Sequence, residues 1–272
     1  MKTPILSIKD RSTISEFASN LPHALLIAAE QGLDGIGAAN ELANSEDSDV
    51  FYIKPAEKKQ TIAVEQVRSL IANLRTYADK RRVIIINDAN LMSEAAQNAL
   101  LKALEEPNKN THFILVAENP KLLLDTIRSR CQLLQLHKTS PSQDAKLLSQ
   151  HNLDASAKQQ ILFLAAGRPL LINQLANSPR KFAEYKEIAV DAKQLLAAKN
   201  NYQALKPLAK YFTDRQKALL LTDIIVNMIR FQVHSRGIDA AVSSKLAAAE
   251  TAAKSLKVNG NVRLALLQLV IY

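Results

Sequence analysis

The stretch RVIIINDANLMSEAAQNALLKALEEPNKNTHFILVA, residues 82–117, contains the alternation that decides the fold. Two short apolar runs, RVIIIN (82–87) and HFILVA (112–117), enclose SEAAQNALLKALEE (93–106), which has the composition of a helix. Its first residue, Ser93, is a good N-cap. The apolar runs are too short for buried helices and do not alternate polar with apolar residues, which is typical of strands buried on both faces of a parallel sheet. The stretch therefore predicts a strand, a crossover helix and a second, parallel strand.

The same alternation continues on both sides of this stretch. Further strands are predicted from HALLIAA (23–29), DVFYI (49–53) and QLLQL (132–136), and further helices from GIGAANELAN (35–44) and TIAVEQVRSLIANLRTYA (61–78). Strands that alternate with helices indicate a parallel sheet with right-handed crossovers. We therefore expect residues 1–137 to form an α/β domain.

Beyond residue 138 the pattern is helical, and no convincing strand is found. Residues 142–177 predict three short helices, of which Gly167-Arg168-Pro169 separates the second from the third. After Asn177-Ser178-Pro179, longer helices are expected at about 180–198, 202–212, 214–235, 239–256 and 260–271, with caps at Thr213 or Asp214 and at Asn259 or Asn261. We expect two helical regions, 138–179 and 180–272.

Composition limits the possible functions only broadly. The net charge is +9, with fourteen Lys and Arg against seven Asp and Glu in residues 181–272, and this favours polyanionic partners weakly. The single cysteine, Cys131, excludes an intramolecular disulfide and a cysteine-based zinc site, and it fits a reducing cytoplasm. The N-terminal segment has charges within its first ten residues and no long apolar core, which does not fit a signal peptide, and no apolar run is long enough to predict a membrane span.

The loop after the first predicted strand lacks most of the residues that bind nucleotide phosphates. A working loop reads G-x-x-x-x-G-K-[ST]: its backbone N–H groups surround the phosphates, its lysine neutralises charge and its hydroxyl holds magnesium. Here the segment Ala29–Ile36 reads AEQGLDGI, in which only Gly32 offers a flexible position. Asp34 replaces the second glycine, Gly35 the lysine and Ile36 the hydroxyl. Because a carboxylate repels a triphosphate, we expect the chain to bind ATP weakly or not at all.

The acidic part of such a site is also altered. The strand RVIIIN ends in Asn87-Asp88-Ala89-Asn90, which retains one carboxylate where metal binding and water activation normally require two. Asp88 has a simpler interpretation, as a cap of the turn into the next helix. Both changes together argue against an active ATPase.

The stretch TIRSRC, residues 126–131, contains a second group suited to phosphate. Arg130 is either a surface or ion-pairing arginine or a phosphate-binding group. Arg128 is expected to be exposed or structural, and Cys131 to be a small buried apolar residue. Lys102, Glu105 and Glu106 lie on one predicted helix, with Lys102 and Glu106 four residues apart, and can form a salt-bridged face.

Three segments together resemble the clamp-loader branch of AAA+ proteins: NALLKALEEP (98–107), FILVAENP (113–120) and LLLDTIRSRC (122–131). The resemblance is dense over residues 83–136. The altered loop and Asn87-Asp88-Ala89 are similar to the delta-prime class of bacterial DNA polymerase III subunits rather than to the ATP-hydrolysing gamma and tau classes. The helical regions are similar in layout to the family's small lid domain (138–179) and its collar domain (180–272), through which subunits oligomerise.

The resemblance implies membership of a five-subunit ring that uses ATP to place a sliding clamp on primer-template DNA during replication. Each ATP site lies between two subunits, and the second subunit supplies an arginine from a Ser-Arg-Cys motif. That motif is Ser129-Arg130-Cys131 here, so the resemblance makes Arg130 an arginine finger acting in trans, with Ser129 and Cys131 as structural neighbours. The implied partners are gamma/tau-like ATPases, a delta-like subunit, the clamp and DNA, without a membrane. ATP and magnesium would lie at the interface with a neighbour, and this chain alone would not be catalytic.

The chain departs from the family at several positions. It has no cysteines for the four-cysteine zinc module of many members. The positions of the family's nucleotide-sensing residues are Ala117 and Glu118 after the strand and Leu170 after Gly167, with Arg168 out of register. Two alternatives stay open: an ATPase with an unorthodox loop, which predicts Mg-ATP binding, and a standalone basic DNA-binding protein, which predicts tight, salt-dependent DNA binding.

Overall fold

The structure is a computed structural model that describes residues 4–44, 48–56, 61–74, 80–236, 239–258 and 260–270. The chain divides into two compact units, one of Met1–Lys158 and Ala165–Gln174 and the other of Gln159–Leu164 and Leu175–Tyr272. The expected domain boundaries, 1–137, 138–179 and 180–272, stay a prediction.

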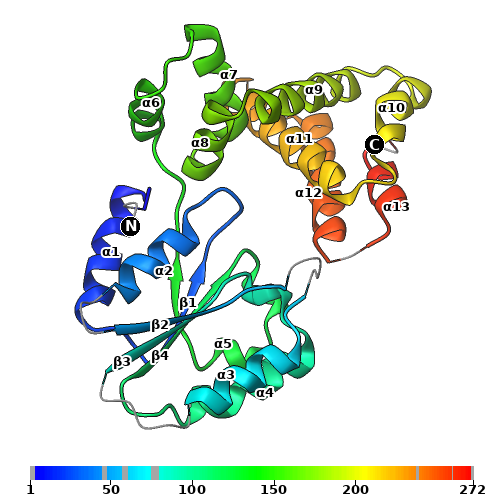
Figure 1. Ribbon diagram of the computed structural model, residues 1–272. Coiled ribbons are helices and arrows are strands. Elements are labelled where there is room, and N and C mark those ends of the chain that lie inside the picture. Colours follow the sequence, from blue (N-terminus) through cyan, green and yellow to red (C-terminus); the bar gives the residue numbers. More distant parts are fainter. Residues whose placement is uncertain are drawn as a thin grey trace. The chain divides into compact units, whose positions relative to one another are not determined.

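The first unit contains a five-stranded parallel sheet in the order β2-β3-β4-β1-β5 (Figure 1). Its strands are β1 (Ala24–Ala28), β2 (Ser48–Ile53), β3 (Arg81–Ile86), β4 (Thr111–Ala117) and β5 (Gln132–Gln135). All five strands and their parallel pairing were predicted from the sequence. β1 lies between β4 and β5, because Leu26 pairs with both Leu115 and Leu133.

Helices cover both faces of this sheet, as the apolar runs predicted. On one face, Leu26, Ile84 and Leu115 belong to a buried core with side chains of α3 (Val64–Leu74), α4 (Glu94–Glu105) and α5 (Asp125–Arg128). On the other face, Leu25, Ile85 and Ile114 pack with side chains of α1 (Ile8–Ser19) and α2 (Gly35–Ala43) (Figure 1). Successive strand residues point to opposite faces, so the unbroken apolar runs fill both cores.

Two helices of the first unit differ from those predicted. α1 was not predicted, because its apolar residues are few and widely spaced. Its start is fixed by Ser7, whose hydroxyl accepts a hydrogen bond from Asp10 N at 3.1 Å, and Ile14 anchors it in the core. The helix expected at 61–78 is α3, which begins at Val64 and is described to Leu74; residues 75–78 lie outside the described part of the chain.

Three short helices follow the sheet, as predicted: α6 (Pro141–Ser149), α7 (Ala155–Ala165) and α8 (Pro169–Asn177). The break between α7 and α8 depends on Gly167, whose φ of +73° favours glycine. The Gly167 N–H donates to the buried carboxylate of Asp144 at 2.7 Å, and its carbonyl accepts from Thr139 N at 3.1 Å. These contacts fix the start of α8, which the loop after β1 contacts.

The second unit is helical throughout its described residues. It contains α9 (Pro179–Leu196), α10 (Asn201–Leu208), a short 3-10 helix (Ala209–Tyr211), α11 (Arg215–Arg236), α12 (Ala240–Lys257) and α13 (Val262–Leu267). Asp214 and Asn261 cap α11 and α13, as two of the proposed caps predicted, whereas Asn259 lies outside the described residues. The helix expected at 260–271 is shorter than predicted.

Arg215 links the start of α11 to the end of α12. Arg215, at the start of α11, donates from Nη1 to Leu256 O and from Nη2 to Gly260 O, each at 2.7 Å. These carbonyls lie at and just beyond the C-terminal end of α12, where a cation is favourable.

None of the helices in the described residues is long and apolar enough to cross a membrane.

Candidate functional site

The loop that follows β1 packs against the start of α8. Gly32 has a φ of +91°, which favours glycine, and its carbonyl accepts a hydrogen bond from Leu170 N at 3.0 Å. A side chain at position 32 would begin 2.9 Å from Cβ of the buried Arg168. The loop is therefore held from outside by residues that lie far along the chain.

Asp34 lies at the N-cap of α2 and is buried. Its Oδ1 accepts a hydrogen bond from Gly37 N at 3.0 Å, and its Oδ2 accepts one from Ile5 N at 3.1 Å. The N-terminus of the helix after the first strand is where nucleotide-binding loops hold phosphate, because its N–H groups and the helix dipole attract an anion. In this chain a carboxylate of the protein itself occupies that position.

Gly35, at the motif's lysine position, has no space for a side chain. An ideal Cβ at this buried residue would lie 2.7 Å from Ala29 Cβ and 2.8 Å from Val116 Cγ1. Ile36, at the hydroxyl position, is half-buried and packs against the apolar core. The loop therefore offers no lysine and no hydroxyl, and a carboxylate fills its anion position, so its residues do not fit ATP and magnesium.

The acidic segment after β3 offers one exposed carboxylate. Asp88 has a φ of +54°, and its Oδ2 accepts a hydrogen bond from Asn87 Nδ2 at 3.0 Å. It occupies the N-cap position of the 3-10 helix Ala89–Leu91, as predicted, and bonds that turn through its backbone carbonyl rather than its side chain. Partial desolvation by neighbouring atoms raises the pKa of this carboxyl. Of the sensing positions, Ala117 is buried, and Glu118 is exposed with its N–H bonded to Asn90 Oδ1 at 3.0 Å.

The Ser-Arg-Cys segment forms the turn between α5 and β5. The Ser129 hydroxyl donates to Thr126 O at 3.1 Å, and Arg128 forms an exposed ion pair with Asp125. Cys131 is partly buried and packs against the core below α4 and α5. Burial raises the pKa of its thiol to about 11, so the thiol is neutral at physiological pH. Arg128 is exposed, as predicted, whereas Cys131 is only partly buried where a buried side chain was expected.

Arg130 has two partners among the described residues, and about a third of its side chain is exposed. Its Nη1 donates to Thr126 O at 2.9 Å, and its Nη2 lies 2.6 Å from Oε1 of Glu105, the last residue of α4. The Thr126 carbonyl is one of the C-terminal groups of α5 without a partner in the helix. The pair between Arg130 and Glu105 was not predicted. The sequence does contain an indication that a cation lies nearby, because two carboxylates in succession at a helix C-terminus oppose the helix dipole.

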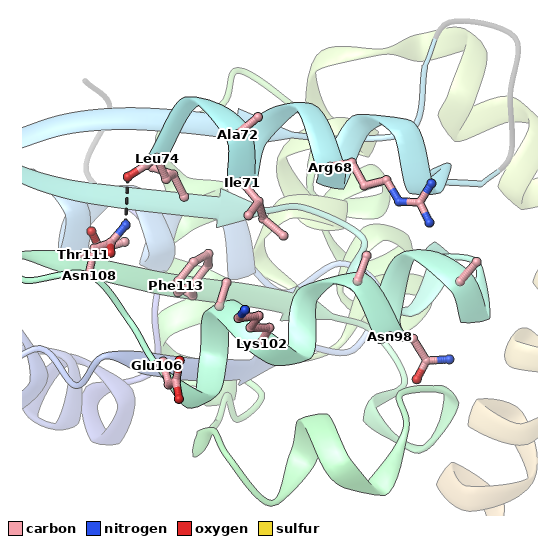
Figure 2. A pocket seen from close by; sticks show the side chains of 13 residues that line it. Arg68, Ile71, Ala72, Leu74, Asn98, Lys102, Glu106, Asn108, Thr111 and Phe113 are labelled. Atoms are coloured by element: carbon pink, nitrogen blue, oxygen red, sulfur yellow. Dashed lines mark hydrogen bonds between the residues drawn. The ribbon is translucent and has the colours of Figure 1, made fainter. Parts of the chain in front are cut away.

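The salt-bridged face considered for Lys102 and Glu106 is not formed. None of the ion pairs within the described residues includes either side chain, although Glu105 next to them pairs with Arg130. Both side chains instead line a groove of about 1000 Å³ between α3 and α4. Figure 2 shows Arg68 and Asn98 at one end of this groove and Asn108, hydrogen-bonded to Leu74 O, at the other.

α4 also holds the other end of α5. The buried Gln97 accepts a hydrogen bond from Leu124 N at 2.8 Å and donates from Nε2 to Leu122 O at 3.4 Å and to Met92 O at 3.2 Å. Leu124 is the residue immediately before α5. The segment from Leu124 to Arg130 is therefore fastened to α4 at both of its ends.

The loop and the arginine lie at opposite edges of the sheet. Ala29 follows the carboxyl end of β1, whereas Arg130 precedes the amino end of β5, which runs parallel to β1 with Leu25 paired to Gln132. The strands between these edges are about 10 Å long or longer. Arg130 therefore cannot reach the loop of its own chain, and the structure does not bring these two sets of predicted residues together.

Comparison with known proteins identifies similar chains. Residues 5–140 match the protein family described as "DNA polymerase III, delta subunit". A DNA polymerase III subunit delta' from Pseudomonas aeruginosa is 30% identical over 203 residues, which cover 72% of this chain and 61% of the relative. The corresponding subunit from Escherichia coli is 35% identical over 127 residues, 44% of this chain and 37% of the relative. The matched part thus spans less than two thirds of either relative.

A solved structure is similar over nearly the whole chain. A DNA polymerase III gamma subunit-related protein from Thermotoga maritima has a TM-score of 0.52 and 18% identity, over 96% of this chain and 97% of the other. At this identity the likeness concerns the fold alone. With the parallel sheet and the helices that follow it, the likeness confirms the predicted fold class, in which a parallel-sheet α/β domain precedes a helical region.

Proposed function

This chain belongs to the family described as "DNA polymerase III, delta subunit", and on that premise we propose that it is a delta-prime-like clamp-loader subunit that hydrolyses no ATP itself. In this role it contributes Arg130 in trans, as an arginine finger, to ATP bound by a neighbouring subunit. The complex would load the sliding clamp onto primed DNA in replication.

The observation that carries this proposal is the position of Arg130. It lies at the edge of the sheet opposite to the loop of residues 29–36, yet about a third of its side chain is exposed. An exposed guanidinium that cannot reach the phosphate loop of its own chain is available to a phosphate on another molecule. The guanidinium stays protonated and offers a planar set of N–H donors, which suits phosphate oxygens.

The loop itself supports the other half of the proposal. The Asp34 carboxylate occupies the anion position at the start of α2, and Gly35 leaves no space for a lysine. A chain that binds no nucleotide can still take part in hydrolysis when it supplies an arginine to a neighbour. Where such arginines have been studied, they accelerate hydrolysis by about 10³–10⁵ at the site they serve.

The proposed partners follow from the family. They are gamma- and tau-like ATPase subunits, which bind ATP and magnesium at the interface, and a delta-like subunit. The clamp and the primer-template DNA are engaged by the complex as a whole. We assign the helices of the second unit to holding the assembly together.

The test is ATP turnover by a complex reconstituted with DNA polymerase III gamma, delta and clamp subunits from the same source. Arg130→Ala should lower turnover at least about twofold, because the site served by this chain loses its arginine while other sites continue. Arg128→Ala is the matched control, since Arg128 is two residues away, is exposed and pairs only locally with Asp125. Assembly, measured by gel filtration, should be unchanged for both variants. Equal turnover with Arg130→Ala and with the native chain would refute the trans role.

A further inference from the structure

We propose that Glu105 is a positioning residue for Arg130: it holds the guanidinium in the orientation in which the arginine meets phosphate. This inference rests on the proposed function, because the role of Glu105 exists only through Arg130. The sequence predicts for Glu105 only a place on a salt-bridged helix face, and the comparisons assign nothing to it.

The two partners of Arg130 contact different nitrogens. Glu105 Oε1 is 2.6 Å from Nη2, and Thr126 O accepts from Nη1 at 2.9 Å. Two contacts on separate nitrogens of one planar group fix both the place and the rotation of that plane. They use two of its five N–H donors, which leaves the others for a phosphate.

The support behind Glu105 is a rigid element. α4 is packed into the core through Leu100 and Leu104, and its residue Gln97 holds the backbone before α5 at Leu124 N. Gln97 and Glu105 are eight residues apart, which is about 12 Å along a helix. The segment that carries the arginine is thus bonded at both of its ends to a single helix. This arrangement favours one fixed orientation of the Arg130 guanidinium.

The place of Glu105 is unfavourable for a carboxylate in the absence of a partner. It is the last residue of α4, where the helix dipole repels negative charge, and the next residue, Glu106, adds a second charge of the same sign. Arg130 offsets this repulsion for Glu105 only. Glu106 forms no ion pair within the described residues, so the contact with Arg130 distinguishes Glu105 from the neighbouring carboxylate.

The pair is exposed enough to admit a third group. The side chains of Arg130 and Glu105 are 35% and 47% exposed. Water screens such a pair, so Glu105 restricts the motion of the guanidinium without neutralising it fully. A phosphate, with greater charge, can therefore bind the remaining N–H groups while the carboxylate keeps its hold.

The test uses the reconstituted complex with Glu105→Ala and Glu105→Gln, and with Glu106→Gln as the matched control. We expect Glu105→Ala to lower kcat for ATP by up to about twofold, and by no more than Arg130→Ala does, with little change in KM, because the orientation of the guanidinium affects the transition state more than substrate binding. Glu105→Gln, which retains an acceptor oxygen, should recover part of the loss. Glu106→Gln should match the native chain, and the melting temperatures of all three variants should agree within a few degrees.

The double variant Arg130→Ala/Glu105→Ala separates positioning from an independent role. If Glu105 acts through Arg130, the double variant has the turnover of Arg130→Ala alone. An additive loss, or a native kcat with Glu105→Ala while Arg130→Ala lowers turnover, overturns the role of Glu105 and leaves the proposed function standing.

A measurement on the isolated chain tests directly whether Glu105 restricts the motion of the Arg130 guanidinium. Nitrogen-15 NMR of the arginine side chains should show slower rotation of the Arg130 guanidinium in the native chain than in Glu105→Ala. Equal rotation overturns the inference at its geometric basis. If rotation differs but Arg130→Ala leaves turnover unchanged, the pair exists, and both the proposed function and the positioning role in turnover are wrong.

Discussion

At one edge of the sheet, the Asp34 carboxylate and the Gly32 carbonyl of the loop 29–36 are hydrogen-bonded within the chain, whereas at the opposite edge Arg130 has two partners and an exposed face. The loop contains a buried carboxylate that takes the position of a phosphate. The arginine segment contains a cation whose partners leave donors available. The comparison shows that a charged side chain can bind a ligand only if its partners within the chain leave some of its donors or acceptors unused. The type of residue alone does not decide this.

The largest expected effect is at Gly35, where Gly35→Lys would restore the lysine of the phosphate-loop motif. Its Cβ would lie within 3 Å of Ala29 and Val116, and the substitution also buries a charge. We expect the free energy of unfolding to fall by about 3 kcal/mol or more, measured by urea denaturation. Gln31→Lys, exposed in the same loop, is the control and should change it by less than about 0.5 kcal/mol. A stable Gly35→Lys variant would show that the loop is less tightly packed than described.

Asp34→Ala tests the internal carboxylate. It removes the cap of α2 and leaves the N–H groups of Gly37 and Ile5 without this acceptor. We expect a loss of about 1–2 kcal/mol in unfolding free energy, and a smaller loss for Asp34→Asn, which can still accept one hydrogen bond. Glu30→Ala, an exposed acidic residue in the same loop, is the control. An effect no larger than that of the control would contradict the assigned role of Asp34.

The thiol of Cys131 gives a pH-dependent comparison within the arginine segment. Its folded-state pKa is raised from 9.0 to about 11 by burial, so its contribution to stability is fully present below about pH 9 and is lost as pH rises toward 11. We expect the native chain to lose about 1 kcal/mol more than Cys131→Ala between pH 8 and pH 10 in urea denaturation. Parallel pH profiles for the two chains would show that the thiol is not shielded.

The smallest expected effect is that of Arg130→Ala on the isolated chain. The pair with Glu105 is partly exposed, so its loss should lower the unfolding free energy by less than about 1 kcal/mol. This is less than the loss expected for Asp34→Ala, and the difference sharpens the contrast between a group used for folding and a group available for function. A loss above about 2 kcal/mol, measured in the same urea experiment, would make Arg130 a structural residue.

Much of the sheet could be predicted because its three central strands, β3, β4 and β1, are buried on both faces. Runs such as RVIIIN and HFILVA admit few other interpretations, and the alternation with helices implies parallel pairing. α1 was missed because its stability comes from the Ser7 cap and from Ile14 in the core rather than from a strong apolar pattern. Local sequence carries little information on such tertiary packing.

The candidate site was predictable by residue but not by contact. The motif positions of Asp34, Gly35 and Arg130 followed from their neighbours in sequence. The contacts of the loop with Ile5 and Leu170, and of Arg130 with Glu105, join segments that are distant in sequence, so no local pattern contains them. That the loop and Arg130 lie at opposite edges of the sheet could be seen only from the register of the paired strands β1 and β5.

The most direct test of this account is a calorimetric titration of Mg-ATP into the purified chain. Because a carboxylate fills the anion position and Gly35 excludes a lysine, the account predicts no detectable heat of binding and no nucleotide-dependent shift in melting temperature. Binding with a micromolar dissociation constant would contradict it: the loop would then accept nucleotide, and the chain would have to be treated as an ATPase.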